Sequence, residues 1–317
     1  MKISVIIPVY NAAKYVRKAT ESALQQPETA EILLIEDNSS DHSLQVCTDL
    51  EEEYERVRLL RHPDGRNHGA GATRNLGIRA AKCDYIAFLD ADDFYLPGRH
   101  SVPKTLFEQH ADTDGVYEAI GVQFYDEQPK QDWLHRRHGE LTTMTERVNP
   151  NVLFEALVRD GKGMFHLDGL TVKRDIFKRC GYFYEHLKLH QDTAMLIRMS
   201  ECAVLIPGRL DTPVAMRGIH GENRILNECS WETRCAARKT LFYWGLRRKL
   251  SVRRLIALFH NYVWSLYATT REHKNLAARE RTWLKRLICA CATHPILFIG
   301  ATLQFVSKMR FPINKAG

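Results

Sequence analysis

The chain has 317 residues, of which 44% are hydrophobic and 26% charged, with a formal net charge of +7 at pH 7. It is long enough to bury a sizeable core, in two domains or in one large domain with an appendage. Its eight cysteines include no CxxC pair and no zinc-site spacing, which excludes a structural zinc module and favours reduced thiols in a cytosolic compartment.

The charge is distributed unevenly along the chain. Residues 231–286 contain 14 Lys and Arg against three Glu and no Asp, and residues 287–317 add three more basic side chains. Residues 231–317 therefore carry +14, which leaves −7 for residues 1–230. An acidic body followed by a basic tail indicates two different tasks within one chain.

The first hundred residues alternate between buried strands and helices. Runs rich in Ile, Leu and Val predict four strands, at 2–10, 31–37, 56–62 and 84–90. Helical apolar spacing lies between them, at 12–26 and 72–82. The first apolar run is too short for a signal peptide, so we expect it to be a strand. This succession predicts an α/β fold with a mostly parallel open sheet, whose ligands lie beyond the carboxyl ends of the strands.

Carboxylates gather where two of these strands end. Asp37 follows the second strand, and the fourth is followed by Asp90, Asp92 and Asp93. Three carboxylates at one strand end repel one another unless a cation lies between them, and hard oxygen ligands suit Mg²⁺ or Mn²⁺. The alternative is an acidic turn. We predict that Asp93 caps a helix that follows it.

A dinucleotide-binding protein is disfavoured. Its phosphate-cradling GxGxxG motif should follow the first strand, but the segment there is NAAKYV, which has no glycine. A GxG pattern occurs only at Gly69 to Gly71, two strands too late. We therefore expect neither a nicotinamide nor a flavin cofactor.

Four segments, in this order and spacing, resemble those of the family 2 glycosyltransferases with the GT-A fold: IIPVYNAAKYV, LLIEDNSSDHS, NHGAGATRNLGIRAA and YIAFLDADD. The resemblance is close over the first 100 residues and looser to about residue 225. It implies a catalytic domain over 1–225, with a nucleotide-sugar-binding half at 1–105 and an acceptor-binding half at 106–225. A basic, largely helical extension would then occupy 226–317.

The resemblance also implies a donor site. Asp37 matches the carboxylate that contacts the nucleotide base, since a carboxylate can accept the ring N–H of uracil or guanine. The wall against which the base packs matches Pro8, Val9 and Tyr10. Arg74, in the segment TRN, would lie near the nucleotide, because a guanidinium suits phosphate binding. The alternatives are a local turn for Asp37 and a solvated helix face for Arg74.

A metal site is implied as well. Asp90, Ala91 and Asp92 correspond to the DxD motif, which ties the ribose and a divalent metal to the diphosphate. The resemblance implies Mn²⁺ or Mg²⁺, which would neutralise charge on the leaving nucleotide. His220, in MRGIHGENR, looks like the segment that some relatives use to reach the metal or the diphosphate. Its alternative is a surface or packing histidine.

The second half should supply the acceptor site and the base. A sugar hydroxyl needs a general base, and Asp192 in QDTAML matches the family's base at a helix start. A helix cap is the alternative role for Asp192. Gln191 stands where Glu is usual and Tyr184 where Asp is usual, which affects acceptor orientation more than the base. We expect His166, Asp168 and Gln191 to line the acceptor pocket.

The basic tail suggests contact with a membrane. Residues 255–268 mix apolar and aromatic side chains with Arg-rich neighbours, and residues 287–307 are uncharged over the length of about one bilayer crossing. His294 and Pro295 make that second stretch a poor spanning helix. We expect residues 231–317 to lie at an anionic membrane surface, with spanning and plain helical packing as alternatives. No nucleic-acid-binding motif accompanies the basic residues, so we expect no nucleic-acid partner.

The resemblance implies an inverting, metal-dependent glycosyltransferase, and the basic tail favours a place at the cytoplasmic face of a membrane. It would move a sugar, with a UDP-sugar favoured, to a glycan or lipid-linked acceptor in cell-surface polysaccharide or glycolipid biosynthesis. A nucleotidyltransferase is one alternative, but it would need a Gly-rich loop after the first strand. The other alternative is a non-catalytic glycan-binding relative docked on the membrane. The acidic residues Asp37, Asp90, Asp92 and Asp192 argue against it.

Overall fold

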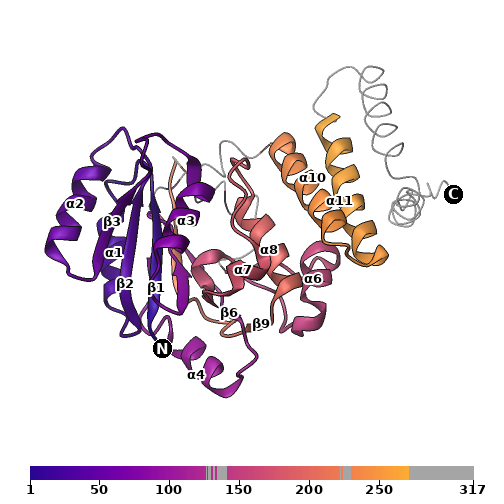
Figure 1. The fold of residues 1–317 in the computed structure, drawn as a ribbon, viewed down its shortest axis with the longest axis horizontal. Coiled ribbons are helices and arrows are strands. Elements are labelled where there is room, and N and C mark those ends of the chain that lie inside the picture. The colour runs from indigo at the N-terminus through magenta and orange to yellow at the C-terminus, as the bar shows by residue number, and fades with distance from the viewer. Residues whose placement is uncertain are drawn as a thin grey trace. The chain divides into compact units, whose positions relative to one another are not determined.

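The structure is a computed structural model that describes residues 1–125, 127, 130, 133, 141–221, 223 and 230–270. The chain divides into two compact units, Met1–Asn227 and Glu228–Gly317. Figure 1 shows strands and helices in the first unit and helices in the described part of the second.

A seven-stranded sheet forms the centre of the first unit (Figure 1). Its strands, in spatial order, are β3 (Val57–Arg61), β2 (Thr29–Glu36), β1 (Ile3–Val9), β4 (Tyr85–Phe88), β8 (Leu170–Lys173), β6 (Gly115–Tyr117) and β9 (Leu205–Pro207). Only β8 runs against its neighbours, and every other pairing is parallel. The predicted mostly parallel sheet is confirmed, and the four predicted strands agree with β1, β2, β3 and β4 to within two residues at each end.

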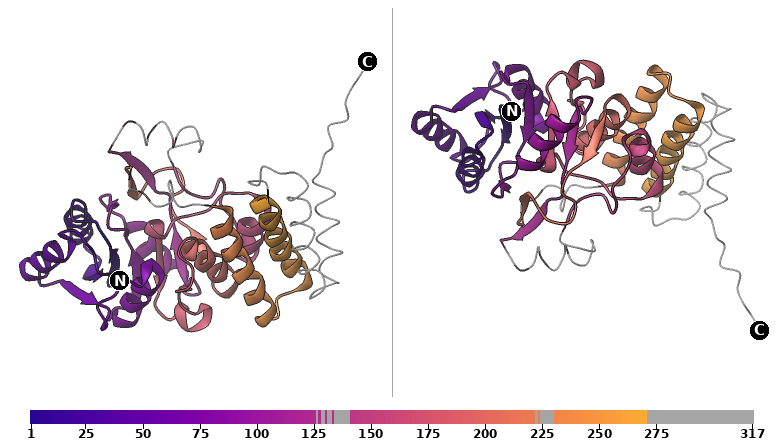
Figure 2. Two further views of the ribbon diagram at one scale, coloured as in Figure 1. Left: turned by 90° about the horizontal axis from the view of Figure 1, so that it is seen from above. Right: turned by 90° about the horizontal axis from the view of Figure 1, so that it is seen from below.

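The two faces of this sheet carry separate apolar cores, because successive strand residues point to opposite sides. Ile6 and Phe88 belong to the core on one face, together with Ile78 of α3. Val5 and Leu34 belong to the other core, which includes residues of α1 and α2. Helices flank the sheet on both sides (Figure 2). A strand covered on both faces needs apolar residues throughout, which explains the unbroken hydrophobic runs.

Seven α-helices belong to the described part of the first unit: α1 (Val16–Leu24), α2 (Ser43–Glu53), α3 (Gly69–Ala80), α4 (Ser101–Gln109), α6 (Leu153–Glu155), α7 (Ile176–Cys180) and α8 (Gln191–Cys202). Short helical turns lie at η1 (Pro150–Val152), η2 (Ala156–Asp160) and η3 (Leu167–Gly169). The helix predicted at 12–26 is shorter, because Ala12 and Tyr15 form a turn before α1. The helix predicted at 72–82 begins three residues early, at Gly69.

A second, three-stranded sheet follows the acidic segment directly. It contains β5 (Phe94–Tyr95), β10 (Ala215–Ile219) and β7 (Gly121–Phe124), with β10 in the middle. The prediction that Asp93 caps a following helix is therefore wrong. Strand β5 follows instead, and a carboxylate oxygen of Asp93 accepts the Gly218 N–H of β10 at 2.8 Å. This pairing joins residues 125 positions apart, which a local pattern cannot indicate.

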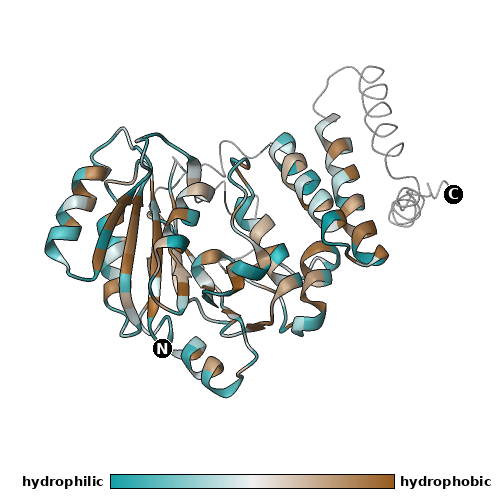
Figure 3. Ribbon diagram, in the orientation of Figure 1, coloured by the Kyte–Doolittle hydropathy of each residue, from teal (hydrophilic) through white to brown (hydrophobic). Residues whose placement is uncertain are grey.

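The described part of the second unit is a pair of helices, α10 (Trp231–Arg247) and α11 (Val252–Thr270). Helix α10 starts with a capping box between Ser230 and Thr233. The two helices pack through Phe242 and Phe259, whose ring centroids lie 5.1 Å apart. Figure 3 shows that α11 carries long apolar stretches. The predicted helical character of the C-terminal part is confirmed for its described residues, 230–270.

No helix within the described residues combines the length and the apolar character needed to cross a bilayer. Helix α11 covers the apolar and aromatic stretch predicted at 255–268. The uncharged segment 287–307 lies outside the described residues.

Candidate functional site

The predicted donor residues lie at one edge of the large sheet. Strands β1, β2 and β4 are parallel neighbours, so their carboxyl ends meet at the same edge. Tyr10 follows β1, Asp37 follows β2, and Asp90 lies two residues beyond β4. In open α/β sheets this edge is where ligands bind.

Asp37 is buried and fastens the start of α3 to the end of β2. One of its oxygens accepts the His68 N–H and the other accepts the Gly69 N–H, both at 2.8 Å. The side chain of Asn67 donates to the Asp37 carbonyl oxygen at 2.8 Å. The local-turn alternative is wrong for Asp37, because these partners lie at least 30 positions away. This cap from outside the helix explains why α3 begins early.

The predicted wall for the nucleotide base holds only in part. Tyr10 is 41% exposed and Pro8 is half-buried, so both side chains are accessible. Val9 is fully buried in the core beside α1 and α2. At this position only the backbone can contribute to the predicted wall, because the place of Val9 in a doubly covered strand points its side chain into the core. The carbonyl of Val9 instead accepts the Asp37 N–H at 2.9 Å.

Arg74 is a buried cation at this edge. Its side chain is 5% exposed, and one terminal nitrogen donates to Asp90 Oδ1 at 2.5 Å. Burial alone would lower the pKa of Arg74, but the carboxylates of Asp90, Asp192 and Asp168 raise it overall. Its Nε and Nη1 are buried and have no hydrogen-bond partner among the described residues. Two unused donors on a buried cation suit an anionic ligand, and a solvated helix face is excluded.

Asp92 forms a second cluster with His220. Its Oδ2 lies 3.1 Å from His220 Nε2 and accepts a bond from Asn223 Nδ2 at 3.0 Å. Tyr15 stacks on the imidazole, with ring centroids 4.8 Å apart. His220 is 7% exposed and its Nδ1 is buried without a hydrogen-bond partner among the described residues. The position of His220 is thus fixed on several sides.

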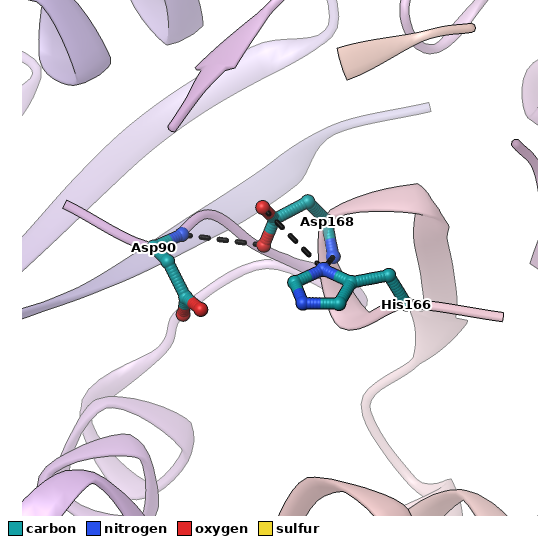
Figure 4. A group of neighbouring side chains, drawn as sticks. All are labelled: Asp90, His166 and Asp168. Atoms are coloured by element: carbon teal, nitrogen blue, oxygen red, sulfur yellow. Dashed lines mark hydrogen bonds and ion pairs between the residues drawn. The ribbon is translucent and has the colours of Figure 1, made fainter. Parts of the chain in front are cut away.

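Asp90 belongs to another cluster, with His166 and Asp168 (Figure 4). The Asp90 N–H donates to Asp168 Oδ1 at 3.2 Å, and His166 Nδ1 lies 3.5 Å from Asp168 Oδ2. One ligand atom from each of the three residues lies within 4.8 Å of the other two. Burial raises the pKa of Asp90, whereas the Asp168 carboxylate raises the pKa of His166 against the opposing effect of burial.

The predicted metal ligands are therefore divided. We predicted Asp90, Asp92 and His220 as one set, but Asp92 and His220 meet each other while Asp90 joins Arg74, His166 and Asp168. Both clusters offer carboxylate oxygens and an imidazole nitrogen, which fit Mn²⁺. The exposed fractions of the two clusters are similar, since the side chains of Asp92 and Asp90 are 29% and 27% exposed, although Asp168 is fully buried. Exposure therefore does not decide between them.

The carboxyl group of Asp93 also interacts with Asp168. Burial and the Asp168 carboxylate, with which Asp93 shares a side-chain hydrogen bond, both raise the pKa of Asp93 well above its usual range. Asp168 is predicted to line the acceptor pocket, but its side chain has no exposed surface. That direct contact is wrong for Asp168, because its segment is drawn into the core. Its carboxylate instead acts on Asp90 and His166.

The predicted base lies in the first turn of α8. Asp192 is the second residue of the helix, and His190, with φ of 62°, occupies the cap position. Burial would raise the pKa of Asp192, but the Thr193 N–H and the charges of His166 and Arg74 lower it overall. Asp192 is therefore ionised at neutral pH, as a base must be, and it is not the N-cap. Gln191 beside it is buried, and its Oε1 has no partner among the described residues.

Several residues of the site were not predicted from the sequence. Asn223 donates to Asp92, and Asn75 contacts the segment before α8. Arg99 is fully buried, donates to the Asp168 carbonyl oxygen at 2.9 Å and pairs with Glu118 at 3.0 Å. The asparagines follow predicted residues closely, at TRN and HGEN, and this proximity is the signal that could have found them. Nothing local marks Arg99, since its partners lie 19 or more positions away.

The sequence pattern described as Glycosyl transferase family 2 matches residues 4–181. Uncharacterized glycosyltransferase YibD of Escherichia coli strain K12 is 38% identical over 140 residues, which are 44% of this chain and 36% of YibD. The matched regions cover only about 15–40% of the length of the curated relatives.

Two solved structures share the fold. TarS 1-349 of S. aureus in complex with UDP-GlcNAc has a TM-score of 0.64 and 18% identity, covering 95% of this chain and 81% of that one. Mannosyltransferase PcManGT of Pyrobaculum calidifontis in complex with GDP-Man and Mn²⁺ has a TM-score of 0.54 and 17% identity, covering 96% and 87%. The fold is thus that of the GT-A glycosyltransferases. The chain belongs to glycosyltransferase family 2.

Proposed function

We propose that the chain is an inverting, metal-dependent glycosyltransferase that uses a nucleotide-sugar donor. The observation that carries the proposal is the position of Arg74, a buried cation that pairs with Asp90 and whose pKa the Asp192 carboxylate also raises. The predicted donor carboxylate and the predicted base thus both act on one charged group. A transferase needs this arrangement, because donor and acceptor must react within one site.

The donor would lie across the edge of the sheet. Its base would pack on Tyr10 and Pro8. Asp37 is buried with both carboxylate oxygens bonded to the start of α3, so to accept a ring N–H with its remaining lone pairs it would have to become exposed as the donor binds. The unused donors of Arg74 would bind the diphosphate. The complexes of TarS with UDP-GlcNAc and of PcManGT with GDP-Man support a nucleotide-sugar donor, and we favour a UDP-sugar. Asp90 and Ala91 would face the ribose side of the donor.

A divalent cation, Mn²⁺ or Mg²⁺, would be held by Asp92 and His220, with Asp90 next to it. The Mn²⁺ in the PcManGT complex supports this choice of cofactor. When bound, the cation would supply charge for the diphosphate leaving group. The residues of this chain hold the two ligands in place, since Asn223 bonds to Asp92 and Tyr15 stacks on His220.

Asp192 would act as the general base on the acceptor side. It would take the proton from an acceptor hydroxyl as that oxygen attacks the sugar, in a single displacement that inverts the configuration. The unpaired Oε1 of Gln191 suits a second hydroxyl of the acceptor. His166 would line the same pocket, held in place by Asp168.

We further propose that the second unit brings the protein to an acceptor at the cytoplasmic face of a membrane, either a glycan or a lipid-linked saccharide. The turn between α10 and α11 supports this, because Arg247, Lys249 and Arg253 are exposed there and Val252 is 60% exposed. Basic residues around an exposed apolar side chain suit an anionic lipid surface. The domain limits 1–225 and 226–317 belong to the same proposal.

A panel of nucleotide sugars tests the proposed activity. The melting temperature of the protein should rise with one nucleotide sugar in the presence of Mn²⁺, because a ligand that binds only the folded state stabilises it. The same donor should be consumed when an acceptor saccharide is added. Stabilisation without consumption would favour a non-catalytic relative, and consumption of a nucleoside triphosphate would favour a nucleotidyltransferase. If no donor raises the melting temperature, the proposed donor site is wrong.

A further inference from the structure

Asn75 of α3 forms hydrogen bonds with the backbone of Phe183, in the segment that precedes α8, and we call this contact the Asn75 clamp. It is 1% exposed, and its side-chain amide pairs with Phe183 in both directions. Asn75 Nδ2 donates to the Phe183 carbonyl oxygen at 3.0 Å, and the Phe183 N–H donates to Asn75 Oδ1 at 2.8 Å. The same Nδ2 donates to Glu185 Oε1 at 2.8 Å. The Asn75 side chain thus bonds to both backbone groups of Phe183, as the backbone of a neighbouring strand would. The two residues lie 108 positions apart.

The same face of α3 lies against the rest of this segment. Gly71, one turn before Asn75, faces it so closely that a Cβ would meet the Tyr184 carbonyl oxygen at 3.1 Å and Gln191 Cγ at 3.6 Å. The guanidinium of Arg74 lies 5.7 Å from the Phe183 ring centre. The helix that carries the donor-side Arg74 is therefore in direct contact with the approach to Asp192.

Arg198 fastens the other side of the segment to α8. It is 3% exposed and donates to the carbonyl oxygens of Cys180 at 3.0 Å and Tyr182 at 2.7 Å. Its guanidinium carbon lies 4.1 Å from the centre of the Tyr184 ring. Since Arg198 and Asp192 belong to one helix, the segment and the proposed base are held as one body. Asn75 gives this body buried hydrogen bonds to α3, and Arg79 of the same helix adds exposed contacts to Glu185 at 3.9 Å and to the Tyr182 ring at 4.7 Å.

We propose that Asn75 is a positioning residue that sets the distance between the proposed base Asp192 and the donor site. The inference rests on the proposed function of Asp192. Arg74 keeps its own bond to Asp90, so loss of the Asn75 clamp would move the base without displacing the donor. A shift of about 1 Å in a reacting group can reduce the rate roughly 10²-fold.

Asn75→Ala and Asn75→Asp test this role. Both remove the bond to the Phe183 carbonyl oxygen. Asn75→Asp also places a carboxylate beside Glu185, whereas Asn75→Ala adds no buried charge, so at least the alanine variant should fold. We expect kcat for transfer to fall about 10- to 100-fold, while KM for the donor and the stoichiometry of nucleotide binding with Mn²⁺ stay within about twofold of the parent. A merely structural role would instead reduce the fraction of protein that binds nucleotide.

Two matched variants complete the experiment. Asn149→Ala removes another asparagine, whose side chain accepts the Asn151 N–H, and should leave kcat unchanged. Glu185→Gln keeps the pairing with Phe183 and should have a smaller effect than Asn75→Ala. Asp192→Asn is measured in the same assay. If Asp192→Asn abolishes transfer but both Asn75 variants retain the parent kcat, the positioning role is wrong. If Asp192→Asn transfers sugar normally, the base itself was misassigned.

Discussion

The donor side and the acceptor side of the site are built in different ways. On the donor side, Asp37 and Asp90 follow strands of one continuous parallel sheet. On the acceptor side, Asp192 and Gln191 follow a left-handed residue, His190, and depend on side-chain clamps from Asn75 and Arg198. A backbone ladder fixes position regardless of most side chains, whereas a clamp depends on single residues. We therefore expect substitutions on the acceptor side to change kcat and those on the donor side to change ligand affinity.

The largest effect should come from the base. Asp192→Asn removes the proton acceptor but keeps the size of the side chain, so transfer should fall by roughly 10²-fold or more, the contribution of general base catalysis. Donor binding should remain close to that of the parent, because Asp37 and Arg74 are untouched. Initial rates with saturating donor and acceptor measure the first expectation, and calorimetry with the nucleotide diphosphate measures the second.

Weaker donor binding together with slower transfer would show that the two sides are not separable. Near-normal transfer would instead reduce Asp192 to a favourable negative charge at the helix start, where it interacts with the helix dipole. Asp175→Asn offers a control that changes a carboxylate at the start of α7, since Asp175 occupies the cap position there without a side-chain cap bond.

Next in size is the loss of the cation. Asp92→Asn and His220→Ala should each weaken the Mn²⁺-dependent affinity for nucleoside diphosphate, by about 10- to 100-fold if they are ligands. Asp168→Asn tests the competing cluster of Asp90, His166 and Asp168. Calorimetry with and without Mn²⁺ separates the clusters. If only Asp168→Asn removes the effect of Mn²⁺, the cation belongs with His166 and not with His220.

The sequence predicts the donor side well because its information is local. An apolar run followed by carboxylates is visible within a few residues, and the parallel sheet then brings the ends of β1, β2 and β4 together. Arg74 was identified through its place in TRN, and it is buried at the predicted edge. Val9 shows the limit of this reasoning, since a motif does not reveal which side chain in a strand points into the core.

The rest of the site depends on pairings between residues far apart in the sequence. The sequence predicts a helix cap at Asp93 because Asp commonly caps helices, but the bond of Asp93 to Gly218 requires that β5 and β10 pair. The sequence neighbours of Asp168 predict a place in the acceptor pocket. The buried partners Arg99 and Asp93 hold its segment in the core instead. Side-chain contacts over such separations leave no periodic pattern, which is why they were missed.

A smaller effect should come from the turn between α10 and α11 of the second unit, which we propose binds an anionic membrane surface. Each basic residue near an anionic surface contributes about 1 kcal/mol, so Arg253→Ala should weaken binding to phosphatidylglycerol vesicles roughly fivefold. Lys239→Ala removes an exposed charge of α10 away from the turn and should matter less. Sedimentation with vesicles at low and high salt measures both. Equal losses for the two variants would mean that net charge, and not the turn, governs capture.

The smallest effect concerns pH. It distinguishes the donor side from the acceptor side through the opposite pKa shifts of Asp90 and Asp192. The pKa of Asp90 is raised, chiefly by burial, whereas the pKa of Asp192 is lowered despite burial by the Thr193 N–H and the charges of His166 and Arg74. As pH falls, the donor-side carboxylate should therefore take up a proton before the base does. An ordinary Asp has a pKa of about 3.9, so Asp192 should remain ionised down to pH 5 and kcat should change less than about twofold between pH 8 and 5.

Acid should act first on donor affinity, as a rise in KM for the donor while kcat holds. Asp90→Asn cannot take up this proton, so the acid rise in KM should be smaller in that variant, although its KM is higher throughout. Complete pH profiles of kcat and of KM, at saturating Mn²⁺, measure the change in kcat and the rise in KM for the donor in one experiment. If kcat falls at a higher pH than the one at which KM rises, the order of the two pKa values is reversed. The donor carboxylate would then be the more acidic group. The charge of Arg74 would lower the pKa of Asp90 more than the pKa of Asp192.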